Sequence, residues 1–371
     1  MEALPHSGLS ATEQLLAAVA EAFDVVSYRV PVEPKGASAA VGRTPSLEIS
    51  GRLRLPSRQA YDLVAERFRR LGFVALFRRQ ADGETIMAVP GELPTTAGRV
   101  RLALILFAAT VLSVLSVGAL SDSPDGGFNV LAGIPFAVSL LSILLAHEMG
   151  HYFTARRLGI PATLPFFIPM PLSLFGTMGA VMQIVAPPRD RRALLKLGAA
   201  GPLAGLIVAI PILLLGLSLS EVKAIPPVAG SFQEGNSLLY MALKYLVFGR
   251  VLPAGGVDVW LHPVALAGWA GLLVTALNLL PAGQLDGGHI AYALFGQRAR
   301  LASGAVIVGL CLLGFLWWGW LIWAALAFVF ARVHAVPLDD VTPLSGRERL
   351  FAILMLVLAV LVFVPVPMQP L

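Results

Sequence analysis

The chain has 371 residues, of which 57% are hydrophobic and 13% are charged, and its mean hydropathy is +0.79. Soluble globular proteins carry roughly 25% charged residues, so the composition excludes an ordinary soluble enzyme and indicates a protein that lies largely within a lipid bilayer. The formal net charge of +5 does not indicate a nucleic-acid partner, because the basic residues flank apolar segments instead of forming one aromatic-rich patch.

Residues 1–98 predict a small soluble α+β domain whose role the sequence does not specify. Ser10 and Glu13 have capping-box spacing at the start of a predicted helix. The remaining predicted elements are a strand at 24–32, a loop at 33–46, a strand within 46–55, a helix at 57–72, and a hairpin of 73–79 and 84–90 that turns at Asp82-Gly83. Residues 91–98 are a predicted linker to the rest of the chain.

Residues 99–371 contain apolar runs that are long enough for membrane helices, which need about 20 residues to cross the hydrocarbon core. Seven runs are candidate spans: 101–120, 129–152, 194–219, 262–280, 301–316, 318–332 and 350–366. A shorter run at 236–251 predicts an amphipathic or re-entrant helix. The predicted fold class is therefore a polytopic α-helical membrane protein with about seven transmembrane helices and a small N-terminal α+β domain.

The distribution of positive charge predicts the orientation of these spans. The connection 121–128 between the first two spans has no Lys or Arg and two acidic residues, which is typical of a non-cytoplasmic loop. Basic residues cluster in 155–159, 187–196 and 332–349 instead. We therefore expect the N-terminal domain to be cytoplasmic, and the second and fourth spans to place their polar ends at the same cytoplasmic depth.

The second span ends in the sequence HEMGH, which holds His147, Glu148 and His151. Residues four apart lie on one helix face, so His147 and His151 can bind one metal ion. Glu148 is placed to act as the general base toward an activated water. The alternative is an interior pair of histidines with Glu148 as counter-ion, but ionisable groups inside a membrane each cost about 2.5–3.5 kcal/mol on insertion scales.

A catalytic zinc site needs a third protein ligand, and Asp286 in the sequence NLLPAGQLDGG is the best candidate. Pro281 ends or kinks the fourth span just before it. Two alternatives remain: Asp286 caps the helix that follows, or His289 is the third ligand. Asn278 either donates a hydrogen bond to a developing oxyanion or bonds across helices.

These two motifs together resemble the site-2 protease family of intramembrane zinc metalloproteases, over about residues 129–300. The resemblance assigns the zinc ligands to His147, His151 and Asp286 and the general base to Glu148. It also matches Asn278 to the asparagine of the second motif. The stretch FGTMGAVMQIVAPPRDRRALLKLGAAGPLAG is similar to the family's segment between the motif helices, and its glycine-rich beginning is a candidate edge strand for an extended substrate.

The finer resemblance is to the EGY-type branch, which has a soluble N-terminal region. The roughly 40 residues of the external segment 221–261 are too few for the PDZ domain that many bacterial relatives carry. Leu285 before Asp286 departs from the proline that some relatives have. The resemblance implies one Zn²⁺ per chain and a transmembrane protein as substrate, cut within the lipid bilayer.

Two other classes of function use the same residues. A polytopic metal transporter would distribute polar groups along a path through the membrane, whereas here they concentrate at one depth. An inactive membrane scaffold would tolerate the loss of a ligand, whereas His147, Glu148, His151 and Asp286 are all present. The sequence therefore favours an intramembrane zinc metalloprotease over both alternatives.

Overall fold

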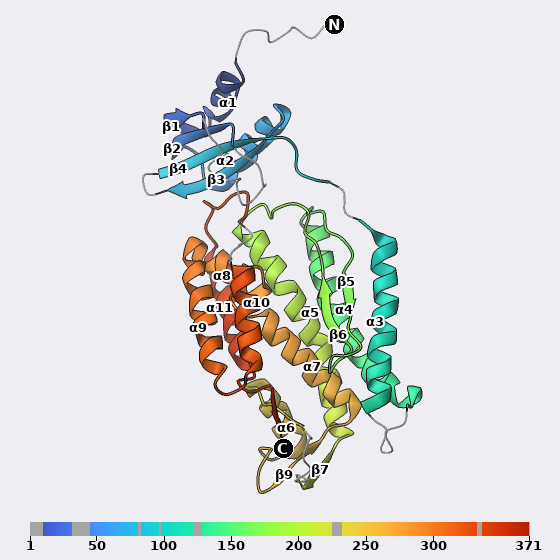
Figure 1. Ribbon diagram of the computed structural model, residues 1–371. Helices are drawn as coiled ribbons and strands as arrows, with labels where there is room; N and C mark the ends of the chain where they lie inside the picture. The colour runs from blue at the N-terminus through green and yellow to red at the C-terminus, as the bar shows by residue number, and fades with distance from the viewer. Residues whose placement is uncertain are drawn as a thin grey trace. The chain divides into compact units, whose positions relative to one another are not determined.

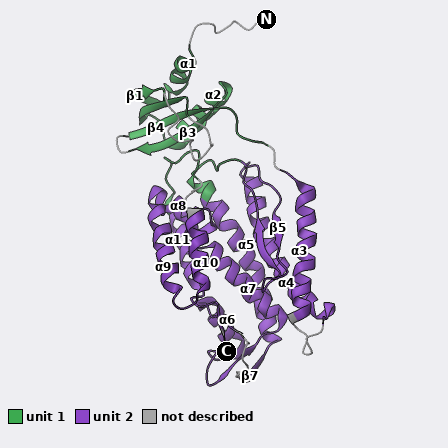
Figure 2. Ribbon diagram, in the orientation of Figure 1, with its two compact units in different colours: residues 1–95, 186–194, 335–346 green, residues 96–185, 195–334, 347–371 purple. Residues whose placement is uncertain are grey.

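The computed structural model describes residues 10–31, 45–80, 83–95, 98–121, 128–224, 232–331 and 336–370. The predicted loop at 33–46, the hairpin turn at Asp82 and the connection at 121–128 lie wholly or mostly outside this part. The chain divides into two compact units (Figure 2). Unit 1 contains residues 1–95, 186–194 and 335–346, and unit 2 contains the remainder.

Unit 1 is built on a four-stranded antiparallel sheet with the strand order β1-β2-β4-β3. Its elements are α1 (Ala11–Val19), β1 (Phe23–Arg29), β2 (Leu47–Leu53), α2 (Ser57–Arg70), β3 (Phe73–Gln80) and β4 (Gly83–Pro90). The predicted capping box is confirmed, because the Ser10 side chain accepts from the Glu13 amide and the Glu13 carboxylate accepts from the Ser10 amide. Both helices bury their apolar faces against the sheet, so the predicted elements form one hydrophobic core.

Two segments from distant parts of the sequence extend this sheet at the β3 edge. The Phe77 amide donates to the Leu338 carbonyl at 2.9 Å, and the Asp340 amide donates to the Phe77 carbonyl at 3.1 Å. Leu338 in turn donates to the Pro188 carbonyl at 2.9 Å. An uncovered strand edge is a site for unwanted pairing. Unit 1 thus protects its edge with segments that the prediction assigned to the membrane part.

Unit 2 is mainly helical (Figure 1). Its helices are α3 (Val100–Ser121), α4 (Val130–Arg157), α5 (Arg191–Ser218, whose first turn belongs to unit 1), α6 (Leu238–Phe248), α7 (Pro263–Asn278), α8 (Asp286–Phe295), α9 (Ala299–Leu313), α10 (Gly319–Ala331) and α11 (Gly346–Val362). Within the described residues, three helices are long and apolar enough to cross a membrane: Val100–Leu120, Val130–Arg157 and Arg191–Ser218. The fold class is confirmed as mostly helical, with a small N-terminal sheet.

Helices α4, α5 and α7 run beside one another (Figure 1), and glycines bring their backbones close together. A Cβ at Gly150 of α4 would lie 2.5 Å from the Ala200 carbonyl oxygen of α5. A Cβ at Gly216 of α5 would lie 2.2 Å from the Ala265 amide nitrogen of α7. Within a lipid bilayer the hydrophobic effect does not drive helices together, so they associate through close packing. Small residues permit the short distances between backbones that this packing needs. These three helices are therefore the scaffold on which side chains from distant sequence positions meet.

A two-stranded antiparallel hairpin of β5 (Phe166–Pro169) and β6 (Thr177–Val181) packs on α3. The rings of Phe107 and Phe167 meet edge to face at 5.0 Å. The Ser113 hydroxyl donates to the Gly176 carbonyl at 2.5 Å. Gly176 has a φ of +75°, which favours glycine, and a Cβ there would lie 2.6 Å from Val114 Cα. The glycine-rich stretch thus forms a hairpin held against the first long helix.

The segment that joins α5 to α7 contains further strands and one short helix. The strands are β7 (Glu221–Ala224), β8 (Phe232–Glu234) and β9 (Val257–Trp260), with β10 (Met368–Pro370) near the end of the chain. β7 pairs with β9, and β8 pairs with β10, both antiparallel. The apolar run at 236–251 forms α6, whose Ser237 side chain caps the helix by accepting from the Tyr240 amide. The pairing of these strands organises the described residues of this segment.

Candidate metal centre

Helix α4 carries three buried ionisable residues near its C-terminal end: His147, Glu148 and His151. Their exposed fractions are 4%, 8% and 8%. The two histidines lie one helical turn apart, and their Nε2 atoms are 3.2 Å from each other. The predicted shared helix face is therefore present, with both ring nitrogens directed to one point.

Asp286 completes this cluster from a segment more than 130 residues away. Its Oδ2 lies 3.3 Å from His147 Nε2, and its Oδ1 lies 3.3 Å from His151 Nε2. Asp286 is the first residue of α8; the N-cap residue is Leu285, and it makes no side-chain capping bond. The capping alternative for Asp286 is therefore wrong, because its carboxylate faces the histidines.

The three side chains form a candidate metal site. Ligand atoms of His147, His151 and Asp286 all lie within 4.8 Å of one another. Among the residues that the structure describes, these three form the one group of His, Cys, Asp or Glu side chains that are close enough together to hold a metal ion. His289 does not belong to this group. The donor set of two imidazole nitrogens and one carboxylate suits Zn²⁺ with one open position.

The orientation of His151 is fixed by the backbone of α5. His151 Nδ1 lies 2.9 Å from the Leu197 carbonyl oxygen. A carbonyl can only accept, so Nδ1 carries a proton and donates it, and the neutral imidazole then presents Nε2 to the cluster as the nitrogen that can bind a metal. Such a bond to the outer nitrogen orients a ligating histidine and raises its basicity. Leu197 contributes through its backbone, and no side-chain motif could have indicated it.

Three glycines of α5 face the cluster at spacings of three and four residues. A Cβ at Gly198 would lie 2.8 Å from the Asp286 carbonyl oxygen, and one at Gly201 would lie 2.0 Å from His151 Nε2. A Cβ at Gly205 would be 3.4 Å from His147, an ordinary contact. These glycines lie in the stretch that the resemblance covered, but no role at the site was predicted for them, although their helical spacing was a usable signal. They leave the space that the ligands occupy.

Asn278, the last residue of α7, also reaches the cluster. Its Nδ2 lies 3.4 Å from His147 Nε2, and α7 packs directly against α4. The structure therefore brings together all five residues that the sequence singled out, from α4, α7 and α8. The geometry is compatible with both roles that the sequence left open for Asn278, a donor to the reacting group and a contact between helices.

The turn between α7 and α8 places Asp286 through close backbone packing. The Ser303 hydroxyl of α9 donates to the Pro281 carbonyl and accepts from the Gly283 amide, both at 3.3 Å. A Cβ at Gly287 would lie 2.0 Å from the Leu279 carbonyl oxygen, and one at Gly288 would lie 2.3 Å from that of Gly283. The glycines of the second motif therefore let the chain fold tightly enough to direct the carboxylate inward.

A second buried cluster of charges lies in the segment between α5 and α7. Lys244 of α6 has a fully buried side chain whose Nζ is 3.0 Å from Glu234 Oε1 and 3.2 Å from Asp258 Oδ1. The Tyr240 hydroxyl lies 3.1 Å from Glu234 Oε1, and Gln233 Nε2 lies 2.6 Å from Asp258 Oδ2. Burial raises the pKa of the Glu234 carboxyl above its usual range. No feature of the sequence predicted this cluster.

Comparison with known proteins agrees with the metal centre. Residues 135–316, which include the ligands and Asn278, match the model of peptidase family M50. The probable chloroplastic zinc metalloprotease EGY2 of Arabidopsis thaliana is 34% identical over 269 residues, which cover 71% of this chain and 48% of that protein.

Two further relatives extend this similarity. The probable chloroplastic zinc metalloprotease EGY1 of Arabidopsis thaliana is 31% identical over 305 residues, covering 74% of this chain and 54% of that protein. The probable chloroplastic zinc metalloprotease EGY3 of Oryza sativa subsp. indica is 30% identical over 255 residues, which cover 62% of this chain and 42% of that protein. The chain thus spans about half the length of these relatives. No solved structure matches.

Proposed function

Because this chain belongs to peptidase family M50 through residues 135–316, we propose that it is a zinc metalloprotease that hydrolyses peptide bonds within transmembrane segments of membrane proteins. The observation that carries the proposal is the convergence of His147, His151 and Asp286, with Glu148 buried beside them, on apolar helices. The EGY relatives are described as zinc metalloproteases, which agrees with the donor set.

The residues fit Zn²⁺ through two unprotonated ring nitrogens and one carboxylate. In the neutral imidazole, the bond from Nδ1 to the Leu197 carbonyl leaves His151 Nε2 available as a ligand, and Asp286 offsets one of the two positive charges of the ion. When bound, Zn²⁺ polarises a carbonyl oxygen and lowers the pKa of a bound water toward 7. All other steps depend on groups of the protein itself.

Glu148 is the proposed general base. It follows His147 directly on α4 and is buried with an exposed fraction of 8%. In this role its carboxylate takes a proton from the water that attacks the scissile carbonyl and then gives it to the leaving amine. The low exposure limits competing bulk water, so that the proton stays at the reaction centre.

Asn278 is the proposed donor to the oxygen of the scissile carbonyl as negative charge develops on it. The position of its side-chain amide within 3.4 Å of His147 Nε2 supports this role. A preorganised donor of this kind contributes about 10²- to 10³-fold to the rate. If Asn278 instead positions His147, replacement of Asn278 lowers the affinity for zinc as well as the turnover rate.

The proposed substrate is a transmembrane segment that unwinds locally, because helix formation hides its carbonyls in internal hydrogen bonds. An unwound segment needs a partner for its backbone, and β6 pairs on one side with β5. Gly179 in β6 has a φ of +90°, and no atom lies within 4 Å of the position of a Cβ there. We propose that the second edge of β6 accepts the extended substrate.

The proposed membrane architecture has seven crossings, with the N-terminal domain and the metal centre at the cytoplasmic side. Three helices have the length and hydropathy of a span, and α6, α7 and residues 319–329 of α10 are shorter apolar helices. Arg156 and Arg157 end α4, five and six residues beyond His151, the last proposed ligand on that helix. Their charge favours a cytoplasmic end under the positive-inside rule.

The test is Glu148→Gln in the full chain, assayed with a single-span model substrate. The expected result is full zinc content and a loss of cleavage of about 10²- to 10⁴-fold. Glu234→Gln, which changes a buried glutamate outside the metal centre, is the matched control and is expected to cleave normally. Undiminished cleavage by the Glu148 variant would exclude Glu148 as the base.

A polytopic metal transporter remains the rival function. It predicts zinc flux into proteoliposomes without proteolysis, and flux that survives Glu148→Gln. Within the described residues, the candidate ligands form one group instead of a path, which favours the protease.

A further inference from the structure

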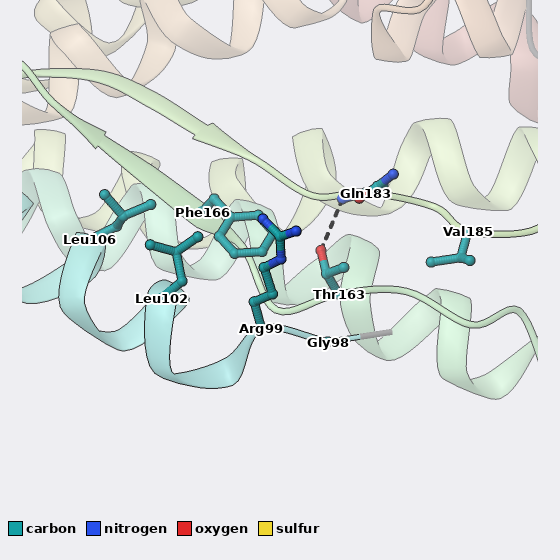
Figure 3. Close-up of a pocket in the computed structure, with 8 residues that line it drawn as sticks. All are labelled: Gly98, Arg99, Leu102, Leu106, Thr163, Phe166, Gln183 and Val185. Atoms are coloured by element: carbon teal, nitrogen blue, oxygen red, sulfur yellow. Dashed lines mark hydrogen bonds between the residues drawn. The ribbon is translucent and has the colours of Figure 1, made fainter. Parts of the chain in front are cut away.

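A cleft of about 440 Å³ lies between the first two turns of α3 and the base of the β5–β6 hairpin (Figure 3). It is separate from the metal centre and shares no residue with it. The lining residues are Gly98, Arg99, Leu102, Leu106, Thr163, Phe166, Gln183 and Val185. All of them belong to unit 2, so the cleft is formed within one compact unit.

The two walls of the cleft are well defined. Leu102 and Leu106 lie four residues apart on one face of α3, and Arg99 directly precedes the helix, three residues before Leu102. On the other wall, the Thr163 amide donates to the Gln183 carbonyl at 3.0 Å, and the Gln183 amide donates to Thr163 Oγ1 at 3.1 Å. Figure 3 shows this second bond and the side chains of both walls. The hairpin base is thereby a fixed surface opposite the helix.

The chemistry of the lining changes along the cleft. Arg99, Thr163 and Gln183 supply polar groups, while Leu102, Leu106 and other apolar side chains supply the rest. Arg99 makes no ion pair with any residue that the structure describes, and no acidic residue lines the cleft. From Arg99 to Leu106 the helix rises about 10 Å. A ligand that fits this surface has an anionic group at one end and an apolar chain at the other.

The position of the cleft on a membrane span identifies the source of such a ligand. The apolar span of α3 begins at Val100, next to Arg99, so Arg99 lies at the boundary where lipid headgroups are found. Leu102 has an exposed fraction of 39%, which leaves apolar surface available at the cleft. Basic residues at this depth attract anionic lipids.

We propose that this cleft is a binding site for one anionic phospholipid. Its phosphate accepts from the Arg99 guanidinium, and one acyl chain lies along Leu102 and Leu106 against Phe166. The bound lipid fills the space between α3 and the hairpin. It thereby supports β5, the strand that pairs with β6. The inference rests on the membrane location in the proposed function and is independent of proteolysis.

The experiment measures lipid retention by native mass spectrometry on the full chain purified in detergent, with added phosphatidylglycerol or phosphatidylcholine. We expect one phosphatidylglycerol per chain at low lipid, and Arg99→Gln to weaken its binding by at least roughly tenfold. Arg101→Gln changes an exposed arginine that does not line the cleft and is the matched control. Equal loss in both variants would show only diffuse attraction and would overturn the proposal.

Two further arms separate the lipid from other occupants. Leu102→Gln is expected to weaken retention several-fold, whereas Leu104→Gln, which is 60% exposed and does not line the cleft, is expected to have no effect. Displacement of the lipid by millimolar glycerol phosphate would identify a site for a soluble anion, and equal retention of phosphatidylcholine would exclude headgroup recognition. Because retention is measured without substrate, an inactive protein that binds the lipid would refute the protease and leave this site intact.

Discussion

The two buried charge clusters of unit 2 differ in whether the protein itself supplies a partner for each buried polar group. Around Lys244, an ammonium and the Tyr240 hydroxyl donate to the carboxylates of Glu234 and Asp258. Around His151, Nδ1 donates to the Leu197 carbonyl, while the Nε2 atoms of His147 and His151 and the carboxylate of Asp286 converge on one point. When the histidines are neutral, these converging atoms can bind one metal cation, which the chain does not supply.

This difference separates a structural from a functional use of buried charge. Burial alone is costly at both places, so burial does not identify the active centre. A complete set of donors and acceptors indicates a network that holds the fold together. Converging atoms that can ligate a metal indicate a site for an ion that the chain does not supply. The following predictions test this distinction.

The largest expected effect is at the third ligand. Asp286→Asn keeps the size of the side chain but removes the negative charge that faces both histidines. We expect zinc per chain, measured by inductively coupled plasma mass spectrometry, to fall well below one, and cleavage to fall to background. Asp258→Asn, the corresponding change in the other cluster, is expected to keep its zinc. Stoichiometric zinc in Asp286→Asn would refute the ligand assignment.

The second prediction concerns the structural cluster. Lys244→Met leaves two buried carboxylates without their cation, which costs about 3–5 kcal/mol of stability. The measurement is the free energy of unfolding in detergent, with zinc per chain determined in parallel and expected to be unchanged in the folded fraction. Lys223→Met removes an exposed ion pair to Glu221 and is expected to leave the free energy of unfolding almost unchanged, because water screens exposed ion pairs. Similar costs for both variants would contradict the buried network.

A smaller effect is expected where α5 supports the ligands. Gly201→Ala introduces a methyl group 2.0 Å from His151 Nε2, so the ring must move. Loss of ligand positioning typically weakens metal affinity about 10- to 100-fold, and we expect a shift of this size in competition with a zinc chelator. Gly205→Ala, with its contact at 3.4 Å, is the control on the same helix face and is expected to bind zinc normally. Equal affinities would show that α5 does not constrain His151.

The smallest effect is a change in pH dependence at Glu234. Burial raises the pKa of this carboxyl in the folded protein, so the folded state binds a proton more strongly than the unfolded state does. Stability from this group is therefore highest below its unfolded pKa of about 4.3 and falls as the pH rises toward the folded value. The measurement is the melting temperature as a function of pH, and Glu234→Gln is expected to remove its decline with rising pH. A decline of the same slope in both proteins would assign it to other groups.

Much of the architecture was predictable because the signals are local. The capping box of Ser10 and Glu13, the helices and the hairpins follow from short-range spacing and hydropathy. Each apolar run from 101 onward forms a helix, although α7 and α9 to α11, which were predicted as spans, are shorter than full spans. The ligand types were also predictable, since HEMGH places two imidazoles on one helix face by geometry alone.

The contributions of the backbone and of distant segments were not predictable. The Leu197 carbonyl that orients His151 has no side-chain signal, and the space at Gly201 depends on how closely α5 approaches α4. The extension of the sheet at Phe77 by Leu338 joins positions about 260 residues apart. Lys244 is one of three basic residues in its segment, and nothing in the sequence distinguishes it as the buried one.

The sequence by itself determined which chemical groups are present and on which helix face they lie, because helical periodicity and hydropathy act over a few residues. Only the tertiary structure decided that Asp286 faces His151 instead of capping α8, and that Lys244 is satisfied by two carboxylates. Both outcomes depend on the approach of helices and strands far apart in the chain, which close packing at glycines permits around Asp286 and strand pairing brings about around Lys244.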